Sequence, residues 1–396
     1  MVYSSKTEYL TMKYSLIIVA LSIWVLPLIS QSINYFPERG AKWEEKAPSD
    51  LQLDEVLLQE AIAFAKANEY SEPHDLQLAI YKSFAHEPYH KILGLTRDRG
   101  EPAGMIIKDG YLVASWGDTK RVDMTFSVTK SYLSTMAAIA LQDGFIGSLD
   151  DKVDQYVWDG LFDGDHNSKI TWRHLLTQSS DWSGELWGGK DWADRPAKEG
   201  DVDDWKFRKL HEPGTNFEYN DVRVNLLSYS LMQVHRKPLP IVLKERVMDP
   251  IGASSTWRWH GYHNSWVEID GLKMQSVSGG GHSGGGLFIN TEDHARFGLL
   301  FLNNGKWKDQ QIIQPSWIKA MTQSSVAEDK YGFMWWLNPE GSEERMTAIS
   351  HNAYYAAGFG GNYIIVEPDH NMVIVLRWLQ PAKANEFISL LKKAIK

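Results

Sequence analysis

Ser127 and Lys130 stand three residues apart in the segment TFSVTKSYLSTMAAIAL, a spacing in which a serine can act as nucleophile and a lysine as its base. The apolar and small residues over 126–143 predict a buried helix, and the spacing places both side chains on one face of it. A serine at a helix start gains from the positive end of the helix dipole. A buried lysine needs a partner or a depressed pKa, and either would help it act as a base. The plainer alternative is an N-cap serine followed by an exposed lysine.

Two other serines match hydrolase patterns by their letters alone. Ser283 lies in GHSGG, but a nucleophile elbow needs a strand before the serine and a helix after it, and neither flank reads so. Asp369 with His370 or His351 could complete a triad with Ser283. We expect a glycine-rich loop there instead, one that shapes a pocket or permits a close backbone approach. Ser389 opens a second Ser-x-x-Lys match, which we interpret as a solvated helix end.

Residues 86–90 read His-Glu-Pro-Tyr-His and so match the zinc motif H-E-x-x-H in letters. That motif needs both histidines on one helical face, whereas Pro88 removes a helix hydrogen bond and clashes with the preceding turn. We therefore interpret the segment as a surface turn. The chain has no cysteine, which excludes disulfides, thiolate metal sites and cysteine nucleophiles. No metal and no cofactor is expected.

The composition indicates a globular protein that does not bind nucleic acid. The 396 residues are 43% hydrophobic and 23% charged, which suits a chain with a sizeable core. Lys and Arg number 41 against 50 Asp and Glu, so the formal net charge is -9, and no run of like charge stands out. A nucleic-acid partner would require a basic patch or stripe.

The N-terminal region is predicted to direct export. Residues 14–29 form an uncharged apolar run, Lys13 precedes it, and the small residues Ser30 and Ser32 follow. This order is typical of a signal peptide over 1–32. The alternative is an uncleaved membrane anchor through residues 14–30, although the run is short for a span of about 20 residues. In both cases the remaining chain lies outside the cytoplasm, in the periplasm or the extracellular space.

The pattern of strands and helices predicts an α+β fold. Hairpins are expected at 103–116, around Asp109-Gly110, and at 362–378, around Pro368-Asp369. The predicted helices are 53–67, 126–143, 171–178, 221–235, 292–304, 315–323 and 384–395. We therefore expect an antiparallel sheet built from both chain ends and flanked by helices, over 33–125 and 292–396. A mainly helical subdomain, 126–291, is inserted between them.

The segment around Ser127 resembles the Ser-x-x-Lys helix of the serine β-lactamase and penicillin-binding-protein superfamily. The rest of the chain follows the order of its class C-like branch. The similar segments are ITWRHLLTQSS (170–180), PGTNFEYND (213–221), GGGLFINTEDHARF (284–297) and GFGGNYIIVEP (358–368). Together they cover roughly residues 90–380, and the resemblance implies a β-lactamase-like fold.

The resemblance also implies an acyl-enzyme mechanism. Ser127 would be the nucleophile, Lys130 its base, and Tyr219 a proton-sharing group toward the leaving group and the deacylating water. Asp221 would hold Lys130 or bind a cationic or hydroxyl group of the substrate. Ala356 and Gly358 would bind substrate on a strand that, with the Ser127 N–H, forms an oxyanion hole.

Two departures from the family pattern favour its esterase and amidase members, such as the 6-aminohexanoate-dimer hydrolase-like group. Asp221 stands where the Tyr-x-Asn motif has asparagine, and the Lys-Thr-Gly site has no lysine, with His351 as the candidate for a partial substitute. The expected substrate is thus a small ester, an amide or a peptide. Two alternatives stay open: a β-lactamase-like binding module without turnover, and a cell-wall D,D-peptidase.

Tryptophan and aspartate gather in the loops between these motifs. The tryptophans are Trp182, Trp187, Trp192, Trp257, Trp259 and Trp266, with Trp335 and Trp336 on a late strand. They are expected either to pack the core and a lid or to form an aromatic wall for the substrate. The aspartates are Asp181, Asp191, Asp194, Asp201, Asp203 and Asp204, which could disfavour anionic substrates at the entrance.

Overall fold

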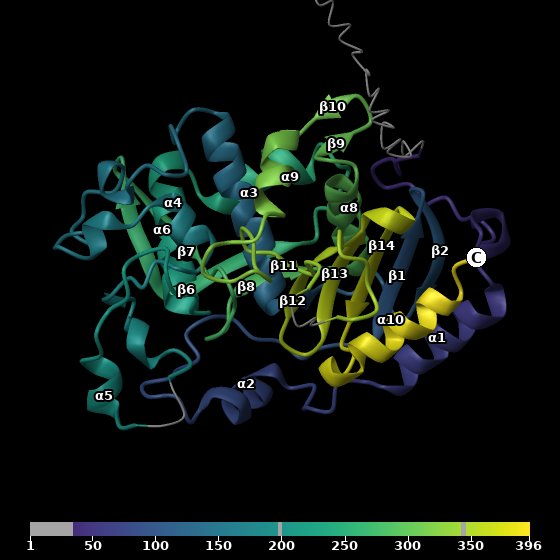
Figure 1. Ribbon diagram of the computed structural model, residues 1–396, viewed down its shortest axis with the longest axis horizontal. Helices are drawn as coiled ribbons and strands as arrows, with labels where there is room; N and C mark the ends of the chain where they lie inside the picture. Colours follow the sequence, from purple (N-terminus) through teal and green to yellow (C-terminus); the bar gives the residue numbers. More distant parts are fainter. Residues whose placement is uncertain (1–34, 197–199, 342–345) are drawn as a thin grey trace, which may run out of the picture. The chain divides into compact units, whose positions relative to one another are not determined.

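Strands from the early and late parts of the chain form the largest sheet of the computed structural model, which describes residues 35–196, 200–341 and 346–396 (Figure 1). Its six antiparallel strands run in the order β11-β12-β13-β14-β1-β2. They are β11 (Trp336–Leu337), β12 (Tyr354–Gly358), β13 (Asn362–Glu367), β14 (Met372–Arg377), β1 (Ala103–Lys108) and β2 (Tyr111–Trp116). The expected α+β fold with a sheet built from both parts of the chain is confirmed.

Turn chemistry explains the two predicted hairpins, which are both present. Asp109 and Gly110 have φ of 52° and 89°, as a two-residue turn between twisted strands requires. Between β13 and β14 the chain turns through Pro368–His370 and then Asn371, whose φ is 50°. The pairing of β14 with β1 joins segments more than 260 residues apart into one sheet.

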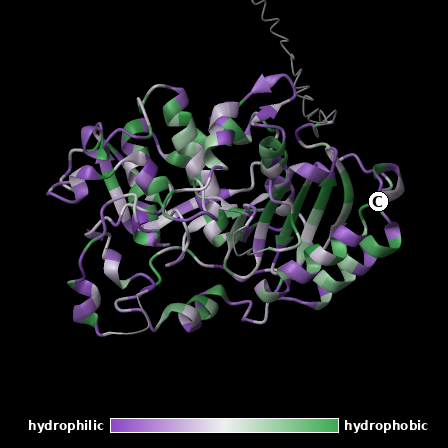
Figure 2. Ribbon diagram, viewed as in Figure 1, coloured by the Kyte–Doolittle hydropathy of each residue, from purple (hydrophilic) through white to green (hydrophobic). Residues whose placement is uncertain are grey.

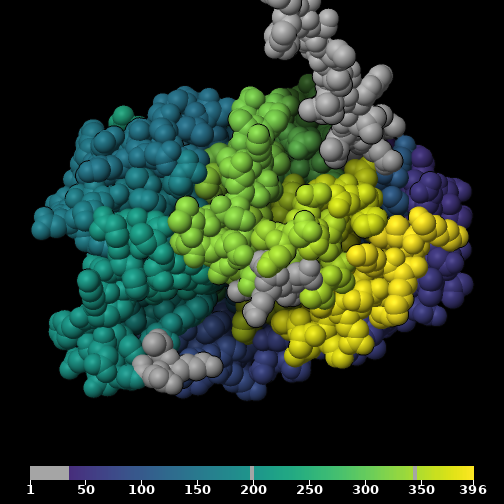
Figure 3. Space-filling model, viewed as in Figure 1, coloured from purple at the N-terminus to yellow at the C-terminus, as the bar shows by residue number. Residues whose placement is uncertain are grey.

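Helices cover both faces of this sheet, so its central strands are buried along their whole length and mostly apolar (Figure 2). On one face α1 (Glu55–Ala67) packs beside α10 (Ala384–Lys393), and Ile106 of β1 points into the cluster they form. On the other face α8 (Thr291–Leu302) packs on β1, β13 and β14, toward Met105 and Ile107. The space-filling view shows the purple and yellow parts of the chain against each other, with the teal middle beside them (Figure 3).

The middle of the chain supplies the helices that carry the candidate site. α3 (Thr129–Gln142) is buried over most of its length and packs on α6 (Asp221–His235). The other helices are α2 (Leu76–Phe84), α4 (Trp172–Leu176), α5 (Val202–Lys206), α7 (Leu239–Leu243) and α9 (Pro315–Met321). Short helical turns occur at Pro48–Leu51, Phe126–Val128, Val153–Gln155, Asn167–Lys169, Asp191–Ala193, Lys244–Met248, Pro368–His370 and Pro381–Lys383.

Within the predicted insertion over 126–291, the helices are accompanied by strands, and much of 258–289 is sheet. A four-stranded sheet runs in the order β3-β8-β6-β7. Its strands are β3 (Asp123–Met124), β8 (Gly286–Ile289), β6 (Arg258–Ile269) and β7 (Leu272–Val277). Asp270 and Gly271, both at positive φ, turn the chain between β6 and β7 as Asp109-Gly110 does in the first hairpin. Two-stranded pairs form between β4 (Glu185–Leu186) and β5 (Gly189–Lys190), and between β9 (Lys306–Trp307) and β10 (Gln310–Gln311).

Residues 33–396 cluster as one compact unit, and the division of that unit into the two subdomains, which together form one domain, stays a prediction. The predicted signal peptide or anchor over 1–32 lies outside the described residues. Over 35–196, 200–341 and 346–396, no helix combines the length and the apolar character that crossing a membrane requires.

Candidate active site

A strained turn presents Ser127 at the start of α3. Ser127 is the middle residue of the 3-10 turn Phe126–Val128, and Thr129 continues directly into the helix. Phe126 has a φ of 50°, a costly conformation for a residue with a side chain. Its buried ring packs against Phe359, with ring centroids 4.9 Å apart, and this packing holds the turn. Strain of this kind is common where a fold positions a functional side chain.

Lys130 lies one turn further along and contacts both Ser127 and Asp221. Its Nζ donates to Ser127 Oγ at 2.9 Å and to Asp221 Oδ1 at 2.6 Å. Lys130 is 1% exposed and Asp221 is 2% exposed, so solvent contacts almost nothing of either charged side chain. Asp221 is the first residue of α6, where the helix dipole favours a carboxylate. The expected contact between Ser127 and Lys130 is therefore observed, and Asp221 is the ion-pair partner of the lysine.

The glycine-rich loop 279–286 makes room for this ion pair. A Cβ at Gly280 would lie 1.7 Å from Asp221 Oδ1 and 2.3 Å from Lys130 Nζ, which no real structure tolerates. The backbone of the loop thus covers the pair as only glycine can. The close backbone approach expected for this loop is thus observed, and His282 and Ser283 of the same loop line a cavity of about 750 Å³, as the other expectation proposed.

Electrostatics favour a charged lysine in the resting site. Burial and, more weakly, Arg195 lower the pKa of Lys130, but the Asp221 carboxylate, Tyr219 and the hydrogen bond to Asp221 together raise that pKa by more, so the net shift is upward. Burial raises the pKa of Asp221, whereas the cations of Lys130 and Arg195 hold that pKa well below its usual range. Of the two expectations for Lys130, a partner or a depressed pKa, the structure shows the partner.

Arg195 is a second cation in the site, and nothing in the sequence pointed to it. Its Nη2 lies 2.6 Å from Asp221 Oδ2, the carboxylate oxygen that Lys130 does not bind. Its Nη1 donates to Asp194 Oδ1 at 2.8 Å, and the backbone N–H of Asp221 donates to the other oxygen of Asp194. Arg195 sits in the loop that reads as a run of aspartates and tryptophans, where an arginine looks like a solvated charge.

Glu87 corrects the expectation of a plain surface turn at 86–90. The turn is present after α2 and His86 is exposed, but Glu87 is buried and accepts from His282 Nε2 at 2.6 Å. Glu87, His90 and His282 each bring one possible ligand atom within 4.8 Å of the others. Because His282 Nδ1 lies 3.0 Å from the guanidinium of Arg195, a metal cation there would face a neighbouring positive charge.

Tyr219 reaches the site through its ring. The ring centroid lies 4.6 Å from Lys130 Nζ and 5.2 Å from Arg195 Cζ, within the range of cation–π attraction. Gln178 positions the segment, because its backbone oxygen accepts from Glu218 N and its side chain accepts from Asn220 N, both at 2.9 Å.

The end of β12 lies against the turn that carries Ser127. A Cβ at Gly358 would come within 2.3 Å of Thr125 O and 3.3 Å of Ser127 N, so the strand passes the nucleophile as closely as a backbone can. The side chain of Ala356, unlike the end of β12 at Gly358, points into the hydrophobic core. Ala356 could therefore contact a substrate only through its backbone.

Aromatic rings gather beside Tyr219, and the tryptophan among them, Trp336, is buried. Trp336 stacks on Tyr219 with centroids 5.7 Å apart and planes 14° apart, and Phe217 and Tyr331 complete the group. Trp182 is also buried in the core and donates to Leu161 O.

Only three of the six aspartates expected near the entrance are exposed, and the other three are buried. Asp181 and Asp191 are buried and pair with the buried Arg223, and Asp194 is buried beside Arg195. Asp201, Asp203 and Asp204 lie at the exposed first turn of α5, where Asp201 caps the helix.

The other motif residues lie outside this arrangement. Ser283 is in the loop between β7 and β8, and its backbone oxygen accepts from Leu93 N and Gly94 N, so the strand-turn-helix of a nucleophile elbow is not formed. Ser389 Oγ donates to Asn385 O within α10. His351 Nδ1 lies 3.3 Å from Asn338 O.

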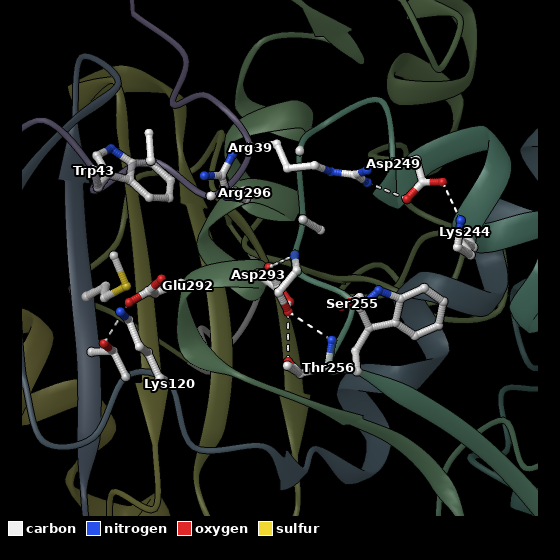
Figure 4. Close-up of a pocket in the computed structure, with 18 of the residues that line it drawn as sticks. Arg39, Trp43, Lys120, Lys244, Asp249, Ser255, Thr256, Glu292, Asp293 and Arg296 are labelled. Carbon is white, nitrogen blue, oxygen red and sulfur yellow. Dashed lines mark hydrogen bonds and ion pairs between the residues drawn. The ribbon is translucent and has the colours of Figure 1, made fainter.

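A cavity of about 1220 Å³ opens elsewhere, beside the start of α8 (Figure 4). Ser127, Lys130, Tyr219 and Asp221 are not among its lining residues. Two buried polar side chains in its lining already have protein partners: Arg296 donates to Pro37 O and Ile251 O, and Asp293 accepts from Ser254 N and Oγ. These contacts serve the packing of the fold.

Curated relatives resemble part of the chain. A "Putative D-alanyl-D-alanine carboxypeptidase" of Escherichia coli (strain K12) is 26% identical over 197 residues, which cover 42% of this chain and 45% of that protein. An N-acetylmuramyl-L-alanine amidase of Bacillus subtilis (strain 168) is 23% identical with the same coverage. The chain thus spans about half the length of the curated relatives it matches.

Solved structures and a family profile cover more of the chain. EstCE1, a hydrolase with promiscuous acyltransferase activity, matches with a TM-score of 0.56 at 16% identity. The matched region covers 86% of this chain and 99% of the EstCE1 chain. A β-lactamase/D-alanine carboxypeptidase from Yersinia pestis has a TM-score of 0.52 at 16% identity and covers 80% and 98%. The profile of the beta-lactamase family matches residues 105–383. With most of the chain matched and the fold shared, this protein belongs to the beta-lactamase family.

Proposed function

We propose that the protein is a serine hydrolase that cleaves an ester or amide bond through an acyl-enzyme on Ser127. The observation that carries the proposal is the buried contact of 2.9 Å between Lys130 Nζ and Ser127 Oγ at the start of α3. A serine hydroxyl is a weak nucleophile unless a base within hydrogen-bond reach takes its proton. Lys130 has that reach once its amine is neutral.

The proposed reaction has two balanced steps. In the first, Ser127 Oγ bonds to the substrate carbonyl carbon while its proton passes to Lys130 Nζ. The resulting oxyanion is held by the Ser127 N–H and the backbone near Gly358, and the leaving group departs with a proton relayed by Lys130 or Tyr219. In the second, water attacks the acyl carbon, gives its proton to the same groups, and returns Ser127 to its hydroxyl form. The reaction needs no metal or cofactor.

An ester or amide with an apolar group is the proposed substrate class. The stacked rings of Tyr219 and Trp336, beside Phe217, offer an aromatic wall close to the nucleophile. Arg195 is committed to the carboxylates of Asp194 and Asp221, so it is not available to grip a substrate carboxylate.

A D,D-peptidase is the second candidate, because the E. coli relative is described as a carboxypeptidase of that type. Such an enzyme must hold the terminal carboxylate of its peptide, for which a free cation is the usual partner. A binding module without turnover is a weaker proposal, since it would give the contact between Ser127 and Lys130 no task.

Intact-mass spectrometry after treatment with a fluorophosphonate, and separately with a penicillin, tests these proposals. We expect a fluorophosphonate adduct on the wild-type protein that is absent from Ser127→Ala and retained by the matched control Ser283→Ala. Penicillin labelling in addition would favour the D,D-peptidase. An adduct that persists in Ser127→Ala would overturn the assignment of the nucleophile, and no adduct with either probe would favour the binding module.

We also propose that the protein is exported, on the strength of the apolar run over 14–29 behind Lys13. Cell fractionation together with the mass of the native protein tests this. A chain shortened near residue 32 in the periplasm or medium indicates a cleaved signal, and a full-length chain in the membrane fraction indicates an anchor. A full-length chain in the cytoplasm would refute export.

A further inference from the structure

The carboxylate of Asp221 is shared between two cations on opposite oxygens. Lys130 Nζ lies 2.6 Å from Oδ1 and Arg195 Nη2 lies 2.6 Å from Oδ2. The side chain of Asp221 is 3% exposed, so solvent does little to weaken either attraction. Lys130 therefore faces a carboxylate whose negative charge is already partly neutralised by Arg195 at its other oxygen.

This sharing matters because a protonated lysine cannot accept the proton of Ser127. A buried carboxylate facing Lys130 alone would hold the ammonium form strongly. A guanidinium on the same carboxylate opposes that hold, since two cations on one anion repel each other. Arginine suits the task, because it stays charged over the whole working range of pH and can bind two carboxylates with its fork.

A chain of hydrogen bonds fixes Arg195 in place. Its Nη2 lies 3.0 Å from His282 Nδ1, and because arginine can only donate, that ring nitrogen must accept. His282 Nε2 therefore carries the hydrogen and donates to Glu87 at 2.6 Å. Burial lowers the pKa of His282, in agreement with this neutral ring. Asp194 holds the other nitrogen of the guanidinium.

Lys130 has neighbours on every element packed against it. The charged and titratable groups that face it are Ser127 on its own turn, Asp221 on α6, Tyr219 before α6, and Arg195 and Asp194 in the preceding loop. The loop 279–286 covers Lys130 with the backbone of Gly280. Among these groups Arg195 is the positive one, so its removal has a definite sign.

We propose that Arg195 is a positioning residue that sets the base strength of Lys130 by sharing the Asp221 carboxylate, and that Glu87 and His282 hold it there. The proposal rests on the proposed function, in which Lys130 takes the proton of Ser127. Arg195 places a positive charge in the site from a different part of the sequence than the 354–361 segment, which has no lysine.

The pH dependence of Ser127 labelling tests this role without knowledge of the substrate. The second-order rate of fluorophosphonate labelling is measured from pH 5 to 10 for wild type, Arg195→Gln, Arg195→Lys and Arg208→Gln. Arg208 is the matched control, because it binds the buried Asp181 through its fork but does not contact Asp221. A circular-dichroism melt of each variant verifies folding.

We expect Arg195→Gln to move the rising limb of the rate profile to higher pH by about one pH unit or more, because Lys130 then faces Asp221 alone. At pH 7 each unit appears as about a tenfold slower labelling. Arg195→Lys, which keeps the charge, and Arg208→Gln should keep the wild-type limb. A uniform fall in rate with no movement of the limb would overturn the proposal, as would equal movement in Arg208→Gln.

A rescue experiment covers the case in which Arg195→Gln does not fold. The Arg195 side chain is 30% exposed, so methylguanidinium can reach the space left in Arg195→Ala. Methylguanidinium should return the limb toward its wild-type position, whereas sodium chloride of equal ionic strength should not. Equal effects of the two salts would refute the role of Arg195. Loss of labelling in the wild-type protein itself would refute the proposed function instead.

Discussion

Replacing Gly280 by alanine tests the buried ion pair at the heart of the site with a single methyl group. The added Cβ would stand 1.7 Å from Asp221 Oδ1 and 2.3 Å from Lys130 Nζ. Both distances are far below van der Waals contact, so the lysine, the carboxylate or the loop must move. Overpacking of this kind costs about 1–3 kcal/mol of unfolding free energy.

The expected effect on reactivity is larger than the effect on stability. If Lys130 Nζ is pushed away from Ser127 Oγ, the site loses its general base, which is worth about 10²–10⁴ in rate. We therefore expect Gly280→Ala to label with a fluorophosphonate at least about 100-fold more slowly than wild type, while its denaturant midpoint falls only modestly.

Gly147→Ala is the matched control for this test. Its added methyl would meet Asp151 Oδ2 at 3.0 Å, a tight contact in a different loop. It should lose some stability and keep the wild-type labelling rate. A Gly280→Ala protein that labels within threefold of wild type would refute the reasoning, because it would mean that Lys130 is not the base or that the pair does not need this space.

Three further predictions concern single side chains. Lys130→Gln should slow labelling of Ser127 about 10²–10⁴-fold at pH 7, measured by intact mass, and a rate within tenfold of wild type would exclude it as the base. Trp336→Ala removes the stack on Tyr219, so KM for aryl or long-chain esters should rise several-fold while KM for acetyl esters stays nearly constant. Burial raises the pKa of Asp181, but two arginines hold it well below its usual range, so its stabilisation is present above about pH 4 and is lost as the pH falls further. Asp181→Asn should cost about 3 kcal/mol at pH 7 in urea unfolding and flatten the acid limb, and an unchanged acid limb would contradict this reasoning.

Local signals account for the elements that were predicted well. The α6 bounds Asp221–His235 agree with the predicted 221–235, because helix periodicity is written within one segment. The hairpin at Asp109-Gly110 was recognised from its turn residues, which need no distant partner. The β6–β7 hairpin carries the same Asp-Gly signal at Asp270-Gly271 and could have been found in the same way.

By itself the sequence predicted the pairing of Ser127 with Lys130, because two residues three positions apart at a helix start lie on the same face regardless of what surrounds them. It also pointed to Tyr219 and Asp221, through their place in a recognisable segment. Only the tertiary structure decided that Arg195 shares the Asp221 carboxylate and that His282, hydrogen-bonded to Glu87, contacts Arg195. It also decided that position 280 has no room for a side chain. These groups come from loops whose charges read as solvated when taken alone, and it is the packing of distant segments that buries them together.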